Sequence, residues 1–220
     1  MTSDNVTRDR GARAGIYNPL TLRLYDAGVL GLTNTMIWRC PTRLLVDHYQ
    51  RHAGDDHLDI GPGTGYFLER ITARSITLLD LNASSLDAAA KRAGTHRVKT
   101  TLRQSYFDLL PHGRQYDSIG VNFVLHCILS RAKWPRLDEL RENLRPGGTL
   151  FGSTIIPDRE TATPLARLLH GIYNQLGVFG NDADTIGQLT ATLASWDDVT
   201  VTRHGQVAIF SARRPQGNQA

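Results

Sequence analysis

Residues 59–65 of this 220-residue chain read Asp-Ile-Gly-Pro-Gly-Thr-Gly, and this glycine-rich segment constrains the fold more than any other. It follows a short apolar run, 57–60, which predicts a strand, and it precedes Tyr66, Phe67 and Ile71, which predict the start of a helix. Glycines at alternate positions allow a tight turn and leave no Cβ in the way of a ligand. The N-terminus of a following helix would attract an anionic or polar group. A simple strand-to-helix turn remains the alternative interpretation.

Strand and helix patterns alternate along most of the chain. The predicted strands are 57–60, 76–80, 98–104, 117–125 and 149–156, and helices are expected at 66–71, 82–94, 134–144, 165–176 and 184–194. The chain closes with strand patterns at 199–202 and 206–212 around a His204-Gly205 turn, which is typical of a β-hairpin. Repeated strand–helix units imply a parallel sheet with right-handed crossovers. We therefore expect an α/β fold with seven mostly parallel strands and a terminal antiparallel hairpin strand. Ligands should bind at the carboxyl ends of the strands.

Two further helix patterns precede the glycine-rich segment. Asn18-Pro19 predicts the start of a helix that Gly31 would end, and a second helix is expected from about Pro41 to just before Gly54. We expect a single domain in four parts. They are a disordered basic tail (1–15), an N-terminal helical cap (16–54), the core (55–214) and a second tail (215–220).

Composition limits the classes of function. The chain has no apolar run of about 18 residues and no apolar N-terminal stretch, so we expect no membrane span, no secretion signal and a cytoplasmic location. The net charge of +4 comes largely from the tails, without a basic stripe interleaved with aromatics, which disfavours nucleic acid. Cys40 and Cys127 lie far apart and lack metal-ligand spacing, so we expect reduced thiols and no metal site.

Asp80 stands 21 residues after Asp59, at the end of the second predicted strand. A carboxylate there can accept hydrogen bonds from both ribose hydroxyls of an adenosine, or it can cap the helix that starts near Asn82. A dinucleotide fingerprint would need glycine at position 66, where Tyr66 stands, and no phosphate-binding loop is present. A nucleoside cofactor without phosphates therefore fits better than NAD.

Four segments together resemble the class I S-adenosylmethionine-dependent methyltransferases. They are LDIGPGTGYFLE (58–69), LLDLN (78–82), QYDSIGVNFVLHCI (115–128) and LRPGGTL (144–150), and the resemblance covers nearly the whole chain. The segment YDAGVLGLTNTMIWR (25–39) is similar to the N-terminal cap of the methyltransferases of ubiquinone and menaquinone biosynthesis and their small-molecule relatives. The resemblance implies a Rossmann-like sheet, S-adenosylmethionine as methyl donor and S-adenosylhomocysteine as product.

The resemblance also implies which residues bind this cofactor. Asp59, Gly61 and Gly63 would hold its methionine end. Asp80 would bind the ribose, Leu81 would pack on the adenine, and Asn122 would lie beside the transferable methyl. In the adenine-contacting loop, two registers place either Tyr106 or Asp108 at the family's acidic position. The full cofactor set is Tyr25, Asp59, Gly61, Pro62, Gly63, Asp80, Leu81, Asn82, Ser105, Tyr106, Phe107 and Asn122.

Methyl transfer is an in-line displacement, so the enzyme must position the acceptor, exclude water and manage one proton. Histidine is the first candidate for the base. His126, after the fourth strand, is the candidate catalytic residue; the alternative is a hydrogen-bonded structural role. His170 is a weaker candidate, and the other six histidines (48, 52, 57, 96, 112 and 204) are expected at the surface. The candidate substrate-binding residues are Tyr17, Trp38, His126, Tyr173 and Asn174.

The sequence thus predicts a metal-independent methyltransferase, monomeric or homodimeric, that acts on a small, apolar or aromatic metabolite. An RNA or protein methyltransferase is the alternative enzyme. It is disfavoured because Asn122 is followed by Phe-Val-Leu rather than by Pro-Pro and an aromatic residue. A non-catalytic module that binds S-adenosylmethionine remains the alternative outside enzymes. The sequence does not choose among oxygen, nitrogen and carbon acceptors.

Overall fold

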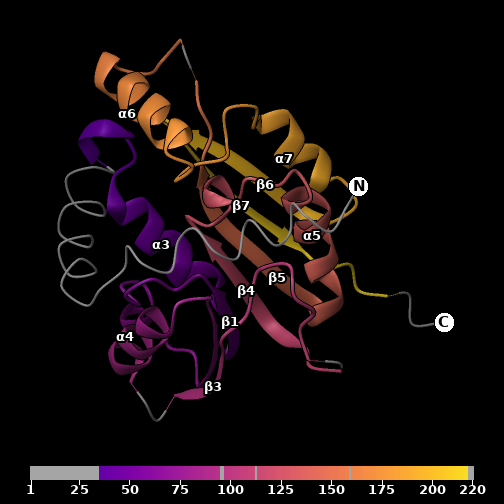
Figure 1. Cartoon of the computed structure of the whole chain (residues 1–220). Helices are drawn as coiled ribbons and strands as arrows, with labels where there is room; N and C mark the ends of the chain where they lie inside the picture. Colours follow the sequence, from indigo (N-terminus) through magenta and orange to yellow (C-terminus); the bar gives the residue numbers. More distant parts are fainter. Residues whose placement is uncertain (1–34, 95–96, 112, 159, 218–220) are drawn as a thin grey trace, which may run out of the picture.

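The computed structural model describes residues 35–94, 97–111, 113–158 and 160–217 (Figure 1). It contains one seven-stranded sheet with the order β3-β2-β1-β4-β5-β7-β6. The strands are β1 (Asp56–Ile60), β2 (Ser75–Leu79), β3 (Val98–Leu102), β4 (Tyr116–Asn122), β5 (Leu144–Ile155), β6 (Asp197–His204) and β7 (Val207–Arg213). Strands β1 to β5 are parallel, and β7 is antiparallel to both β5 and β6. The predicted α/β fold with a terminal antiparallel hairpin strand is confirmed.

Helices cover both faces of this sheet. They are α3 (Thr42–His52), α4 (Ala83–Ala93), α5 (Lys133–Glu139), α6 (Pro164–Gln175) and α7 (Ile186–Thr192). In Figure 1, α3 and α4 lie on one side of the sheet and α5 and α7 on the other. Because side chains alternate along a strand, the core is divided in the same way. One buried cluster includes residues of α3 and α4, and the other includes residues of α5 and α7.

The helix predicted after the glycine-rich turn is absent from the described residues, and that prediction was wrong. Only a short 3₁₀ turn, Leu68–Arg70, follows. In an α-helix the Leu68 carbonyl would accept the N–H of residue 72. Here the Arg97 guanidinium donates to the Leu68 and Ile71 carbonyls at 3.0 and 2.7 Å, which holds the chain in a non-helical path. No helix N-terminus therefore faces the ligand at this turn.

Several element boundaries also differ from the prediction. Residues 145–148 (Arg-Pro-Gly-Gly), which lie between the predicted helix 134–144 and the predicted strand 149–156, belong to β5, where the Gly148 carbonyl accepts the N–H of Arg214 at 2.8 Å. Strand β4 ends at Asn122, because Phe123 adopts a positive φ of 54° and a 3₁₀ turn, Leu125–Cys127, follows. The hairpin turn is Gly205-Gln206 rather than His204-Gly205, since the Gln206 N–H is donated to the Trp38 carbonyl.

Two histidines expected at the surface are buried. His48 Nε2 lies 2.9 Å from the Phe210 carbonyl oxygen, and His57 Nδ1 lies 2.8 Å from Ser118 Oγ. Burial lowers the pKa of His48 to about 4 and that of His57 to about 3, so both are neutral at physiological pH. Both rings contact Phe151 of β5, His48 from within α3 and His57 from β1 of the same sheet, and local sequence does not reveal this contact.

The predicted N-terminal helix around 18–31 lies outside the described residues. The second helix predicted before the glycine-rich segment is confirmed as α3, and α4 is capped by Asn82 and followed by Gly94 as expected. Helix α7 starts at Ile186 with a capping box between Thr185 and Gln188. No helix in the described part of the chain is long and apolar enough to cross a lipid bilayer.

Candidate functional site

The strand order reverses direction between β1 and β4, which is where open parallel sheets bind ligands. Asp59 of β1 is in register with Gly120 of β4, so the segments after these two strands start side by side. The glycine-rich turn, the end of β2 at Asp80 and the end of β4 at Asn122 therefore lie at one edge of the sheet. This edge brings together most of the cofactor-binding residues predicted from the sequence.

The glycines of the turn have distinct roles. Gly61, Gly63 and Gly65 all have positive φ, at 66°, 56° and 77°. A Cβ at Gly61 would lie 2.4 Å from the Val124 side chain, and one at Gly65 would lie 2.7 Å from the Ala89 backbone. At Gly63 a Cβ would meet nothing within 4 Å. The outer glycines are therefore required by packing, whereas the backbone of Gly63 faces open space that a ligand can use.

Asp59 is buried at this edge and accepts a hydrogen bond from α3. The hydroxyl of Tyr49, in α3, donates to Asp59 Oδ2 at 2.5 Å. Burial raises the pKa of Asp59 to about 7, the Tyr49 hydrogen bond lowers it, and the nearby Asp80 carboxylate raises it. Tyr49 is not among the site residues predicted from the sequence, because its position in a helix pattern predicts only a core residue.

Asp80 and Asn82 follow β2. Asp80 Oδ1 accepts the backbone N–H of Asn82 at 2.8 Å, and Asn82 Oδ1 caps α4 through the N–H of Ser84. Burial raises the pKa of Asp80 to about 6, against the lowering effect of backbone N–H groups. The Asn82 Nδ2 amide is buried and has no hydrogen-bond partner within the described residues, and Leu81 is half exposed. A buried donor of this kind is normally paired with an ordered water or a ligand.

Asn122 ends β4 beside the same space. Its Oδ1 accepts the Ser153 hydroxyl at 3.0 Å, and its amide faces the Tyr49 oxygen. Asn122 Nδ2 forms no hydrogen bond of ordinary geometry in the described part of the chain. The next residue, Phe123, carries the positive φ, and such strained residues gather at functional sites.

The loop after β3 is closed by its own side chains. Asp108 Oδ2 accepts the Ser105 N–H at 2.8 Å. Asp108, one of the two candidates for the family's acidic position, therefore holds the loop together. Tyr106 is buried, and its hydroxyl donates to the Lys133 carbonyl at 3.2 Å; burial raises its pKa. Its ring points into the core, and Phe107 packs at the edge of the same core. The loop therefore offers Ser105, Phe107 and backbone groups to the site rather than the Tyr106 side chain.

The Phe179 ring packs against three of the predicted substrate-binding residues. Its ring lies 6.0 Å from Trp38, 4.7 Å from His126 and 4.9 Å from Tyr173 between centroids. These aromatics come from the N-terminal segment, the turn after β4 and α6, so the fold gathers residues that are far apart in sequence. We call this group, Trp38, His126, Tyr173 and Phe179, the aromatic cluster. Tyr17 and Tyr25 lie outside the described residues.

His126 is buried in this cluster. Its Nδ1 accepts the backbone N–H of Ile155 at 3.4 Å, so a neutral ring carries its proton on Nε2. Asn174 does not join the cluster, because its amide contacts His170 and Asn181. His170 in turn lies 3.5 Å from Asp182.

Across residues 35–94, 97–111, 113–158 and 160–217, no three or more His, Cys, Asp or Glu side chains are placed to hold a metal ion. Cys40 and Cys127 are free thiols, as expected from the sequence.

Comparison with known proteins decides the family. Residues 58–150 match a family model described as a methyltransferase domain. The chain is 37% identical to YbcY of Escherichia coli (strain K12), over 83% of this chain and 98% of that one. It is 31% identical to the physcion biosynthesis cluster O-methyltransferase of Aspergillus chevalieri, over 91% of this chain and 94% of that one. The chain belongs to the methyltransferase family. This methyltransferase also shares its fold with an O-methyltransferase family protein from Burkholderia thailandensis (TM-score 0.66, 17% identity, 90% of this chain and 60% of that one).

Methyltransferases of this class use S-adenosylmethionine as the methyl donor, and the described edge of the sheet fits that cofactor. The open backbone at Gly63 leaves room for it, and the Asp80 carboxylate offers acceptors. The buried Asn82 amide offers a donor that no described residue uses. The Asp80 carboxylate and the Asn82 amide are polar groups of the kind that can bind an adenosine.

Proposed function

We propose that this methyltransferase transfers the methyl group of S-adenosylmethionine to a hydroxyl oxygen of a small, apolar or aromatic molecule. The observation that carries the proposal is the aromatic cluster, which has His126 only four residues after Asn122. An aromatic wall suits a flat apolar acceptor and an approaching sulfonium. A relative named as an O-methyltransferase supports oxygen as the acceptor atom.

We further propose how the cofactor is held. When bound, S-adenosylmethionine supplies an electrophilic methyl group on a sulfonium. Asp80 accepts hydrogen bonds from its ribose, with Leu81, Asn82, Ser105 and Phe107 around the adenine. The turn from Asp59 to Gly63, including Gly61 and Pro62, holds the methionine end, and Asn122 lies toward the reacting centre. Tyr25 and the Tyr106 backbone complete the predicted set.

For His126 we propose positioning rather than base catalysis. Taking up a proton at Nδ1 would break its hydrogen bond with the Ile155 N–H. A buried ring edge-on to Phe179 is better suited to shape the acceptor site and exclude water, which are the main tasks in methyl transfer. Trp38 and Tyr173 would contact the acceptor beside it, and Tyr17 and Asn174 remain predicted contacts.

Two measurements test the proposal. Calorimetry should show binding of S-adenosylhomocysteine and not of NAD, and Asp80→Ala should weaken it; unchanged affinity would contradict the ribose assignment. A screen with radiolabelled S-adenosylmethionine over phenols, amines and carbon acids should label phenols first. Exclusive labelling of amines or carbon acids would overturn the choice of oxygen. The predicted cytoplasmic location and monomeric or homodimeric state remain predictions.

A further inference from the structure

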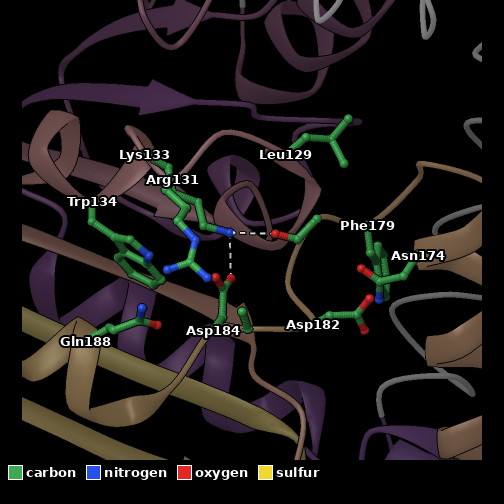
Figure 2. A pocket seen from close by; sticks show the side chains of 11 residues that line it. Leu129, Arg131, Lys133, Trp134, Asn174, Phe179, Asp182, Asp184 and Gln188 are labelled. Atoms are coloured by element: carbon green, nitrogen blue, oxygen red, sulfur yellow. Dashed lines mark hydrogen bonds and ion pairs between the residues drawn. The ribbon is translucent and has the colours of Figure 1, made fainter. Parts of the chain in front are cut away.

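A second cavity lies away from the glycine-rich turn. It encloses about 260 Å³ between the segment 129–134, the loop 179–184 and the first turn of α7 (Figure 2). Phe179 and Asn174 border it at one end, and Trp134 and Gln188 lie at the other. The proposed cofactor residues do not line it.

Lys133 connects the segments around this cavity, and its ammonium group has hydrogen-bond partners within the protein. Lys133 is buried, and its Nζ donates to the carbonyl oxygens of Leu125, Ile128 and Gly180 at 3.1, 3.2 and 3.0 Å. It also forms an ion pair with Asp184 Oδ2 at 2.5 Å. Figure 2 shows the two contacts with Gly180 and Asp184. Since the two charges compensate each other, neither is left to bind a ligand.

Three hydrogen-bond donors remain at the Trp134 end. Trp134 is 8% exposed, and its Nε1–H is buried with no acceptor among the described residues. Gln188 uses its Oε1 to accept the Thr185 N–H at 3.0 Å, which directs its amide N–H₂ elsewhere. The Arg131 guanidinium lines the same space as Asp182 and Asp184. Against the raising effect of burial, its charge acts to lower the pKa of the Asp184 carboxylate, but no ion pair joins Arg131 to a described carboxylate, and Asp184 is already paired with Lys133. In Figure 2 the indole, the guanidinium and the Gln188 amide lie at one end of the cavity.

The combination selects a ligand chemistry. An indole N–H can only donate, and a buried donor without an acceptor costs free energy that a ligand can recover. A guanidinium adds positive charge and prefers planar oxyanions. Leu129 and Phe179 provide apolar surface further along the cavity.

We propose that this cavity binds the carboxylate of a small organic acid, through the Trp134 N–H and the Arg131 guanidinium, with its apolar body toward Phe179. Two sources share this chemistry. The carboxylate belongs to the methyl acceptor, because Phe179 is also part of the aromatic cluster, or it belongs to a separate acid. Only the first source rests on the proposed function.

Calorimetry with benzoate on the full chain tests the cavity itself. Trp134→Phe keeps an aromatic ring and removes the N–H, and Arg131→Gln removes the charge. Each should weaken benzoate binding by about tenfold, the usual effect of losing one charge-assisted hydrogen bond. Arg167→Gln, an exposed arginine on α6, is the matched control and should bind benzoate like the parent. S-adenosylhomocysteine affinity should stay unchanged in all three variants, which verifies that they fold. No benzoate binding, or equal binding in all variants, would overturn the proposal.

Kinetics with 4-hydroxybenzoate and its methyl ester separate the two sources. If the acceptor supplies the carboxylate, Arg131→Gln raises KM for the acid and not for the ester. If a separate acid binds, the variant affects both substrates equally while benzoate binding is still weakened. A lack of turnover on every phenol would contradict the proposed function alone, because the benzoate titration is independent of methyl transfer.

Discussion

The Tyr49 hydroxyl donates a 2.5 Å hydrogen bond to the buried carboxylate of Asp59, and so joins α3 to the start of the glycine-rich segment. The Tyr49 ring is stacked on Phe67 with centroids 4.8 Å apart. Gly120 leaves room for the hydroxyl, since a Cβ there would lie 3.2 Å from it. Helix α3, the start of the glycine-rich segment and β4 therefore all contact the Tyr49 hydroxyl oxygen. A substitution at Tyr49 should alter the proposed cofactor edge.

Tyr49→Phe should weaken cofactor binding. Losing a hydrogen bond to a buried charged group costs about 1–3 kcal/mol, so the affinity for S-adenosylhomocysteine should fall by roughly five- to 150-fold. The pKa of Asp59 should rise further, because the lost bond is what lowers it. Tyr66→Phe, the same change beside the turn, is the control for calorimetry and thermal unfolding. Equal affinities in the two variants would rule out a link between α3 and the site.

Cofactor affinity should depend on pH through Asp80. The ionised carboxylate is the form that accepts hydrogen bonds from a ribose, and burial raises its pKa to about 6. Affinity should therefore rise as pH increases from 5 to about 6 and level off above 7, by at most about tenfold per pH unit. Calorimetry at several pH values measures this profile. The Asp80→Asn variant should bind the cofactor weakly, and its affinity should depend little on pH. An unchanged pH dependence would assign the titration to another group.

His57 should make the fold less stable in acid. Its folded pKa of about 3 lies far below its unfolded value of 6.5. Stability from this group is therefore complete above pH 6.5 and is lost as pH falls toward 3, at about 1.4 kcal/mol per pH unit. His57→Gln keeps a partner for Ser118 and removes the titration. Urea unfolding between pH 4 and 7 should give a smaller acid-induced loss in this variant than in the parent; parallel curves would show that His57 does not contribute.

Gly63→Ala and Gly65→Ala should fail in different ways. Both place a side chain at positive φ, which costs about 1 kcal/mol or more. At Gly65 the new methyl also meets the Ala89 backbone at 2.7 Å, so unfolding should occur at a clearly lower temperature. At Gly63 it enters open space, so the fold should survive while S-adenosylhomocysteine binding is lost. Thermal unfolding and calorimetry on both variants separate the effects, and full binding by Gly63→Ala would show that the ligand does not approach there.

The sheet was predictable because its signals are local. Apolar runs, the capping residue Asn82 and the C-terminal hairpin pattern each depend on neighbours in sequence. The spacing from Asp59 to Asp80 likewise predicted two carboxylates at one edge, and the structure brings both to it. The loop after β3 was less predictable, since the direction of the Tyr106 ring depends on its contact with Lys133 of α5.

The sequence was enough to predict the order of the strands, most of the helices, the glycine-rich turn and the family. It did not determine the path after the turn, where Arg97 from another segment takes the carbonyls that a helix would have used. Nor did it reveal the burial of His57 or the bond from Tyr49 to Asp59. Periodicity and turn chemistry act between near neighbours, whereas a hydrogen bond or a desolvated charge depends on which distant segment packs against it. Only the tertiary structure supplies that partner.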